Sequence, residues 1–311
     1  MTQPSVRDDA LLTGLVALRA ALGELRLPLG LPGAQEHRAH AARLLAHLDD
    51  HLLPRVRQRG APLLAVIGGS TGAGKSTLVN ALVGAVVSPA SVLRPTTRSP
   101  VLVHHPDDEA WFASERVLPG LARWQGTGAG AADSVRLVAH ASVPRGLALL
   151  DAPDIDSVVD ENRRLGAQLL GAADLWVFVT TAARYADAVP WDLLAGAAAR
   201  DAVVGIVLDR LEPRERTAVV AHLSEMLDAR GLPDASLLTV PESPVTDGLL
   251  PREAVAEVDR WLRSTVVDAS ARERVVQRTI HGSVADLVTR IPALVVAADA
   301  QVAHAALLRG I

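Results

Sequence analysis

Cysteine, lysine and aromatic residues are scarce in this chain, and each scarcity excludes something. The 311 residues include no cysteine, so disulfide bonds and thiolate metal sites are excluded, which suits a reducing cytoplasm. Aromatic residues make up 3% of the sequence and hydrophobic residues 49%, so the core must consist mainly of leucine, valine and alanine. A chain of this length allows one large α/β domain with a smaller appendage.

Neither the charge nor the apolar runs indicate nucleic-acid binding or a membrane span. The formal net charge of −4 predicts no nucleic-acid partner. No stretch reaches 18 uninterrupted apolar residues, and residues 291–308, interrupted by Pro292 and Asp299, predict an amphipathic helix that packs in a bundle. The N-terminal residues lack the basic-then-apolar order of a signal peptide. We expect a cytoplasmic protein, with peripheral association at the inner face of the cell membrane as an option.

The only lysine is Lys75, although lysine and arginine together number 31. It lies in a glycine-rich segment that follows the apolar run Leu63–Ile67 and precedes an expected helix, as a nucleotide phosphate loop requires. We expect the loop backbone to bind phosphate, Lys75 to bridge the β- and γ-phosphates, and the Ser76 hydroxyl to coordinate Mg²⁺. The predicted nucleotide-binding residues of this loop are Gly69, Ser70, Thr71, Gly72, Ala73, Gly74, Lys75, Ser76 and Thr77.

The periodicity predicts an α/β fold, in which a mostly parallel sheet is covered by helices on both faces. Further strands are expected at residues 101–104, 135–139, 147–150, 175–180, 203–208 and 237–240, and helices at 162–170, 188–199 and 214–230. Helical periodicity in the terminal regions predicts a small bundle beside the sheet. We divide the chain into N-terminal helices at 1–59, a phosphate-loop domain at 60–250 and C-terminal helices at 251–311. The natural chain could continue beyond residue 311 into a membrane-binding region.

Two further segments fit a nucleotide switch. Residues 93–100 contain Thr96 and Thr97 just before an expected strand, where a switch threonine would close on Mg²⁺ and the γ-phosphate; an ordinary loop is the alternative. Asp151 ends a hydrophobic strand, which is the position of a direct or water-mediated Mg²⁺ ligand, or of a turn-capping aspartate.

These motifs, with Asp-Ala-Pro-Asp-Ile-Asp-Ser at 151–157 and Ala-Asp-Leu-Trp-Val-Phe-Val at 173–179, resemble bacterial dynamin-like GTPases, particularly an actinobacterial branch. The resemblance covers roughly residues 34–294 and implies a P-loop GTPase domain that uses GTP or GDP with Mg²⁺. It implies flanking helices that move with nucleotide state, and a homodimer or a heterodimer with a related GTPase. By the same resemblance Thr97 is the switch ligand for Mg²⁺, with Thr96 the alternative, and Asp151 takes the strand-end acidic role.

Two motifs depart from the family pattern. Guanine recognition there usually uses Asn-Lys-x-Asp, whereas this chain has Asp209, Arg210 and Glu212 at the corresponding place, with Ser243 in a later loop. Glu212 could accept two hydrogen bonds from guanine and Arg210 could stack on the base, but a solvated charged loop is equally compatible. The other departure is Asp154, which stands where many GTPases have glycine and is our candidate catalytic residue beside Lys75 and Thr97.

Hydrolysis is expected to be slow, because Ile155 stands where some GTPases carry a water-orienting glutamine. The main alternative is a nucleotide-binding scaffold with relaxed base specificity and little hydrolysis, which acts through partners. A phosphate-loop kinase is a third interpretation. Three histidines, His40, His47 and His51, predict a solvated helix face rather than a metal site, and His104 is expected at the surface.

Overall fold

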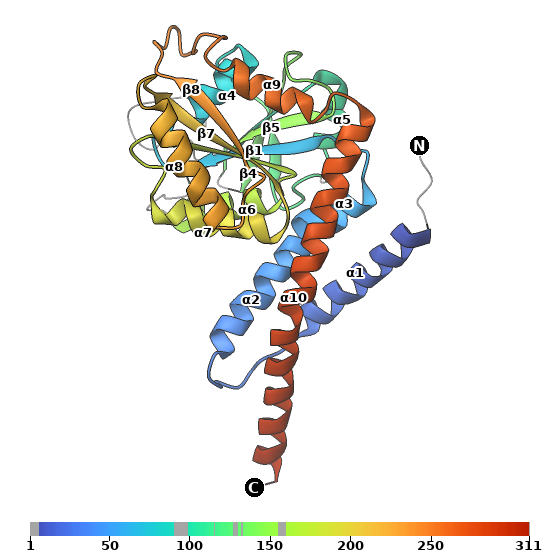
Figure 1. Ribbon diagram of the computed structural model, residues 1–311. Coiled ribbons are helices and arrows are strands. Elements are labelled where there is room, and N and C mark those ends of the chain that lie inside the picture. Colours follow the sequence, from blue (N-terminus) through green and yellow to red (C-terminus); the bar gives the residue numbers. More distant parts are fainter. Residues whose placement is uncertain are drawn as a thin grey trace.

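An eight-stranded sheet lies at the centre of the computed structural model, which describes residues 6–89, 99–114, 116–126, 130–131, 133–154 and 160–310 (Figure 1). All seven strands predicted from the sequence are present. The eighth, β3, is a three-residue strand at the edge of the sheet that the hydrophobic pattern of the sequence did not predict. The strands are β1 Leu63–Gly69, β2 Val101–His104, β3 Ala122–Trp124, β4 Ser134–Ala139, β5 Leu147–Asp151, β6 Leu175–Thr181, β7 Val203–Leu211 and β8 Ser236–Pro241.

The order across the sheet is β3-β4-β2-β5-β1-β6-β7-β8. Every neighbouring pair is parallel except β2 and β5, which run antiparallel. The carboxyl ends of β5, β1, β6 and β7 therefore meet at one edge, where ligands bind in open α/β sheets. Together with the helices on both faces, this topology confirms the predicted α/β fold with a mostly parallel sheet.

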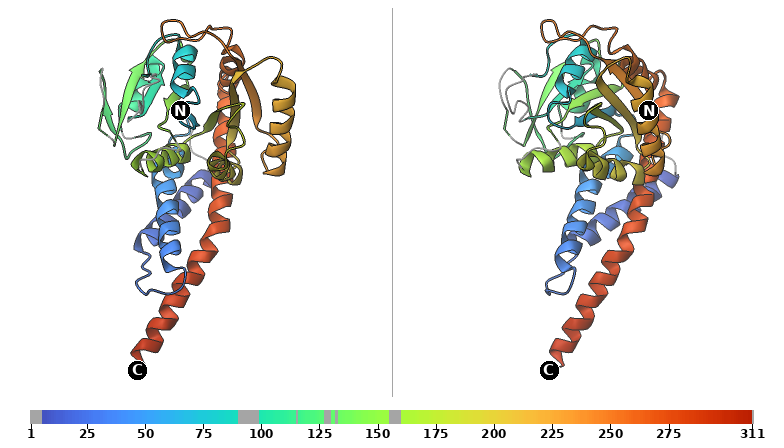
Figure 2. Two further views of the ribbon diagram at one scale, coloured as in Figure 1. Left: turned by 90° about the vertical axis from the view of Figure 1, so that its left-hand side faces the viewer. Right: turned by 60° about the vertical axis from the view of Figure 1, so that its left-hand side comes forward.

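Helices cover both faces of the sheet (Figure 2). Apolar residues of α4, α9 and α10 pack on one face, and those of α5, α6, α7 and α8 on the other. Strand β1 is buried on both faces and is apolar throughout, as expected of a central parallel strand. The helices are α4 Lys75–Val83, α5 Glu109–Phe112, α6 Asp160–Gly171, α7 Ala188–Ala199, α8 Arg216–Ala229, α9 Ala256–Ser264 and α10 Ala269–Arg309, with a short 3₁₀ turn at Pro106–Asp108.

The N-terminal helices pack against α10 below the sheet (Figure 1). They are α1 Val6–Glu24, α2 Ala34–His47 and α3 Leu53–Arg57, with the π-helical turn Leu48–Leu52 joining the last two. This π turn ends at Leu52, two residues before Pro54. Apolar residues of α1, α2 and α3 share one continuous core with the α4, α9 and α10 face of the sheet, so the predicted bundle is joined to the sheet.

Helix α10 runs along the sheet and then past α1 and α2 (Figures 1 and 2). Its early residues are buried, and Gln301 binds the backbone of Leu29 through two hydrogen bonds of 2.8 and 3.0 Å. Residues 291–308 are helical as predicted, and Leu294 is buried, but the bundle covers only part of their apolar surface. The residues that are more than half exposed are Val295, Val296, Val302, Leu307 and Leu308. Within the described residues α10 is the one helix long and apolar enough to span a membrane; its most apolar window has a mean hydropathy of 1.6 and is 11% buried.

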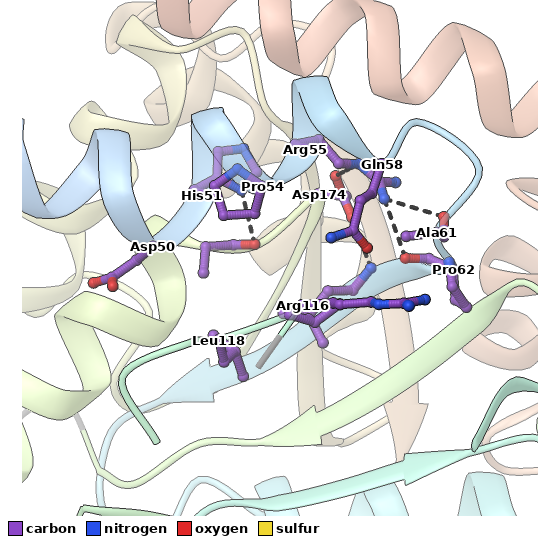
Figure 3. A pocket seen from close by; sticks show the side chains of 13 residues that line it. Asp50, His51, Pro54, Arg55, Gln58, Ala61, Pro62, Arg116, Leu118 and Asp174 are labelled. Atoms are coloured by element: carbon purple, nitrogen blue, oxygen red, sulfur yellow. Dashed lines mark hydrogen bonds and ion pairs between the residues drawn. The ribbon is translucent and has the colours of Figure 1, made fainter. Parts of the chain in front are cut away.

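A buried ion pair joins α3 to the sheet (Figure 3). Arg55 Nε lies 2.9 Å from Asp174 Oδ1, and both side chains are at most 6% exposed. The other oxygen of Asp174 accepts a hydrogen bond from Leu64 N at the start of β1, and Arg55 Nη1 donates to the Ala61 carbonyl. The Asp174 side chain thus ties α3 to the amino ends of β1 and β6, because Asp174 directly precedes β6.

Two predictions about histidine were wrong. His51 is 5% exposed, because the π turn directs it toward the sheet domain, where its Nδ1 lies 3.0 Å from the Ala172 carbonyl oxygen. Its ring stacks on that of His47, whose ring nitrogens are also buried, with centroids 5.4 Å apart. His104 is 1% exposed and stacks on Phe112. Trp176 and Phe178 lie in the core as predicted.

Candidate functional site

The phosphate loop has a backbone that only glycine accommodates at two of its positions. Gly69 has a φ of 151°, and a Cβ there would lie 2.2 Å from the Val179 carbonyl oxygen of β6. Gly74 has a φ of 95° and caps α4, and a Cβ there would lie 2.3 Å from Asp209 Oδ2. The loop therefore passes closely between the ends of β6 and β7, and it presents backbone N–H groups at the positive end of α4.

Lys75 is 6% exposed and uses every hydrogen-bond donor of its ammonium group. It donates to the carbonyl oxygens of Gly69 and Ser70, at 3.0 Å each. The third donor bonds the Asp154 carboxylate, which is 27% exposed and follows β5. Two of the three predicted catalytic residues are thus in contact.

Ser76 and Asp151 lie together beside Lys75. The Ser76 hydroxyl donates to Asp151 Oδ2 at 2.6 Å, and the Ser88 hydroxyl donates to the same oxygen. Burial raises the pKa of the Asp151 carboxyl, while the two hydroxyl donors and the charge of Lys75 oppose that rise.

The predicted Mg²⁺ ligands can be tested by their donor atoms. Asp151 is fully buried, and its Oδ1 has no hydrogen-bond partner among the described residues. A buried carboxylate oxygen next to a serine hydroxyl is the kind of oxygen pair that Mg²⁺ takes in phosphate-loop enzymes. Ser76 and Asp151 therefore fit the ion.

The end of β7 reaches the phosphate loop from the other side. Asp209 packs against Gly74, and Arg210 Nη2 donates to the Gly72 carbonyl at 2.7 Å. Burial raises the pKa of the Asp209 carboxyl, against the lowering effect of the Arg210 charge. Arg210 has a positive φ of 54°, an uncommon conformation for a residue with a side chain, so its place over the loop is enforced by the fold.

The remaining predicted residues are not brought to the loop by any described contact. Glu212 pairs with Arg214 at 2.6 Å on the surface. Ser243 is half-buried and donates to the Pro241 carbonyl of its own loop. Thr96 and Thr97 lie outside the described residues. The roles assigned to these residues stay predictions.

Sequence reasoning missed three residues that hold the site together. Asn80, on α4, is completely buried and binds the backbone of Val87 and Ser88 through its carboxamide, which orients the Ser88 hydroxyl toward Asp151. Arg184 donates to the Thr71 carbonyl at 2.9 Å. A lone asparagine within an apolar helical stretch could have indicated such a backbone anchor, whereas nothing local indicates Ser88.

A separate polar cavity lies at the opposite edge of the sheet, where β1 begins (Figure 3). Arg55 of α3 and Gln58, which follows that helix, line it together with Arg116 and Asp174. Its volume is about 30 Å³, which holds about one water molecule, whereas ligand pockets measure roughly 300 Å³ or more. It is therefore no nucleotide site.

Comparison with known proteins supports the resemblance seen in the sequence. The model of the dynamin family matches residues 64–127, which include the whole phosphate loop. This match confirms the likeness to dynamin-like GTPases for that part of the chain. No curated protein matches the chain.

Solved structures with a similar fold are distant in sequence. An oligomerised bacterial dynamin pair, described as sensing and tethering membranes over long range, is 13% identical with a TM-score of 0.49, covering 93% of this chain and 57% of that one. Toc33 from Arabidopsis thaliana, in complex with GDP and Mg²⁺, is 13% identical with a TM-score of 0.40 and coverages of 76% and 92%. Era from Aquifex aeolicus, bound to GDP and AlF₄⁻, is 16% identical with a TM-score of 0.39 and coverages of 64% and 56%.

Proposed function

We propose that this chain is a dynamin-like GTPase that binds GTP and GDP with Mg²⁺ and hydrolyses GTP slowly. The observation that carries the proposal is the juxtaposition of three groups at the carboxyl edge of the sheet. Lys75 lies in the glycine loop, and the Ser76 hydroxyl lies 2.6 Å from the buried Asp151 carboxylate. This combination is what a phosphate-loop enzyme needs to hold a triphosphate and its magnesium ion.

The chain's own groups would divide the work of phosphate binding. Backbone N–H groups of the loop and the N-terminus of α4 bind the phosphate oxygens, and Lys75 neutralises charge between the β- and γ-phosphates. Ser76 and Asp151 hold Mg²⁺, which offsets the negative charge of the phosphates, and Thr97 completes this ligand set. Hydrolysis is slow because Ile155 cannot orient a water molecule.

Base recognition is assigned to the end of β7. The bond from Arg210 to the Gly72 carbonyl of the loop supports a role for its extended guanidinium beside the base. Asp209 and Glu212 supply carboxylates that can accept the two N–H groups of guanine, and Ser243 lies in the following loop. We therefore favour guanine over adenine.

Nucleotide binding is proposed to act through the helices and through a partner. The core that includes α4 continues into α1, α2 and α10, so a shift at the loop has a packed route to the helical part. The partner is a second copy or a related GTPase that meets the nucleotide face. The exposed apolar residues at the end of α10 support peripheral association with the inner face of the membrane.

Phosphate release measured against protein concentration tests the proposal, with Lys75→Ala as the control. A dimerising GTPase shows a specific activity that rises with concentration and is lost in the control. GTP binding with a flat trace at the level of the control would instead support the second candidate, a scaffold without hydrolysis. The contact between Asp154 and Lys75 favours that alternative, because an acid at this position opposes the γ-phosphate.

A further inference from the structure

Asp154 and a γ-phosphate require the same ammonium group. In the structure the three donors of Lys75 are divided among the Gly69 carbonyl, the Ser70 carbonyl and the Asp154 carboxylate. An ammonium group has three donors, so Lys75 cannot bond a phosphate oxygen as well without releasing one of these partners. Which partner is released decides what the site discriminates.

The carboxylate is the partner that can move. The two carbonyls belong to the backbone of the phosphate loop, which is held by the close approach of Gly69 to Val179. The Asp154 side chain is 27% exposed and follows the end of β5 by three residues. Rotation of one partly exposed side chain costs far less than refolding a buried loop, so phosphate displaces the carboxylate.

The displaced carboxylate remains on the γ-phosphate side of the site. β5 lies parallel to β1, and Asp151, its last residue, bonds the Ser76 hydroxyl that faces the metal position. Asp154 lies just beyond Asp151 on the same chain segment and reaches the same lysine. Either nucleotide must displace Asp154 to bond Lys75, but only a triphosphate then places its γ-phosphate beside the displaced carboxylate, whereas a diphosphate leaves that position to Asp154.

We propose that Asp154 is a specificity-determining residue that competes with the γ-phosphate for Lys75 and biases the site toward nucleoside diphosphate. The inference rests on the proposed function, because it assumes that a guanine nucleotide binds at this loop. It goes beyond that function because it states that one side chain, Asp154, sets the ratio of the affinity for diphosphate to the affinity for triphosphate. By this account the chain holds GDP in preference to GTP until the Asp154 carboxylate is displaced or neutralised.

Calorimetric titration of the full chain with GDP and with guanosine 5′-(β,γ-imido)triphosphate, at fixed Mg²⁺, tests the inference. The variants are Asp154→Asn, which keeps the size and removes the charge, and Asp154→Gly, which removes the side chain. Asp107→Asn is the matched control, since it removes one negative charge near Arg145 at the opposite edge of the sheet. Circular dichroism confirms that each variant is folded.

We expect both Asp154 variants to raise the affinity for the triphosphate analogue relative to that for GDP by about tenfold, or about 1.4 kcal/mol, because they remove the repulsion between the carboxylate and the γ-phosphate. The Asp107→Asn control should match the wild type in its affinity for both nucleotides. Binding of both nucleotides with an unchanged or lower preference for the triphosphate analogue would overturn the inference and leave the proposed function standing. Absence of binding in the wild type and in every variant would overturn the proposed function itself.

Discussion

His51 shows how strongly a single residue depends on the fold around it. Its ring is buried beside the Ala172 carbonyl, and the positive charges of Arg200 and Arg55 lie near it. Burial, reinforced by these charges, lowers the pKa of His51 to about 3. The folded protein therefore keeps this ring neutral at a pH where the unfolded chain binds a proton.

Acid should destabilise the protein partly through this histidine. Because the folded pKa lies below the unfolded value of about 6.5, stability from this group is present above pH 6.5 and falls as the pH drops toward about 3. Between pH 7.5 and pH 5.0 this loss amounts to about 2 kcal/mol. His51→Asn, whose amide can still donate to Ala172, should reduce the loss of unfolding free energy by about that amount in urea titrations at the two pH values. Equal losses in the variant and the wild type would refute this assignment.

Residues whose chemistry is local were predictable, and those defined by distant contacts were not. Lys75 and Ser76 lie in one loop and Asp151 at the end of a strand, so their spacing predicted that they would come together. His51 is buried against the Ala172 carbonyl, 121 residues away, and the Asp154–Lys75 contact joins segments 79 residues apart. The polarity of the histidines predicted that they would be exposed to solvent. That prediction failed because polarity does not reveal which face of an element packs on the sheet domain.

At the scale of elements, α10 approaches the sheet domain through a glycine. A Cβ on Gly282 would lie 1.9 Å from the Arg200 carbonyl oxygen, at the end of α7. No side chain fits there unless the two helices move apart. The close approach of α10 to α7 therefore depends on one missing methyl group.

Gly282→Ala should lower the free energy of unfolding by about 1–3 kcal/mol, because the added methyl collides with backbone. Alanine is by itself the better helix former, so the matched control Gly14→Ala, in open space on α1, should stabilise the protein by up to about 1 kcal/mol. Chemical denaturation of both variants measures these changes. Stabilisation by both substitutions would show that α10 does not pack as described.

Long and strongly patterned elements were predicted well, and short ones were not. The core strands β1, β5 and β6 are continuous apolar runs, which is typical of strands buried on both faces. β3 has three residues and pairs at the edge of the sheet, too short for any periodicity to appear. The π turn Leu48–Leu52 was also not predicted. It packs against α1 and α6, and such tertiary contacts leave no local sequence pattern.

At the scale of the whole molecule, α10 extends beyond the helices that cover it (Figure 2). Its last turns expose Val296 at 69% and Leu307 at 68%. Such an apolar surface on a projecting helix is consistent with the membrane association proposed above.

Val296→Asp should weaken co-sedimentation with phospholipid vesicles at least tenfold, since one buried valine contributes about 1.5–3 kcal/mol. Thr217→Asp, which adds the same charge to the exposed surface of α8, should leave vesicle binding unchanged. Neither variant should alter nucleotide binding. Vesicle binding that is absent in the wild type, or equal in both variants, would contradict the proposed membrane surface.

The most direct test of the whole account is a calorimetric titration with GTP, GDP and ATP, with and without Mg²⁺, on the wild type and on Lys75→Ala. We predict micromolar binding of guanine nucleotides, strengthened for GTP by Mg²⁺ and lost in Lys75→Ala, with ATP at least about tenfold weaker. Equal affinity for ATP would contradict the assignment of Asp209, Arg210 and Glu212 to guanine recognition. Absence of any nucleotide binding would contradict the account at its centre.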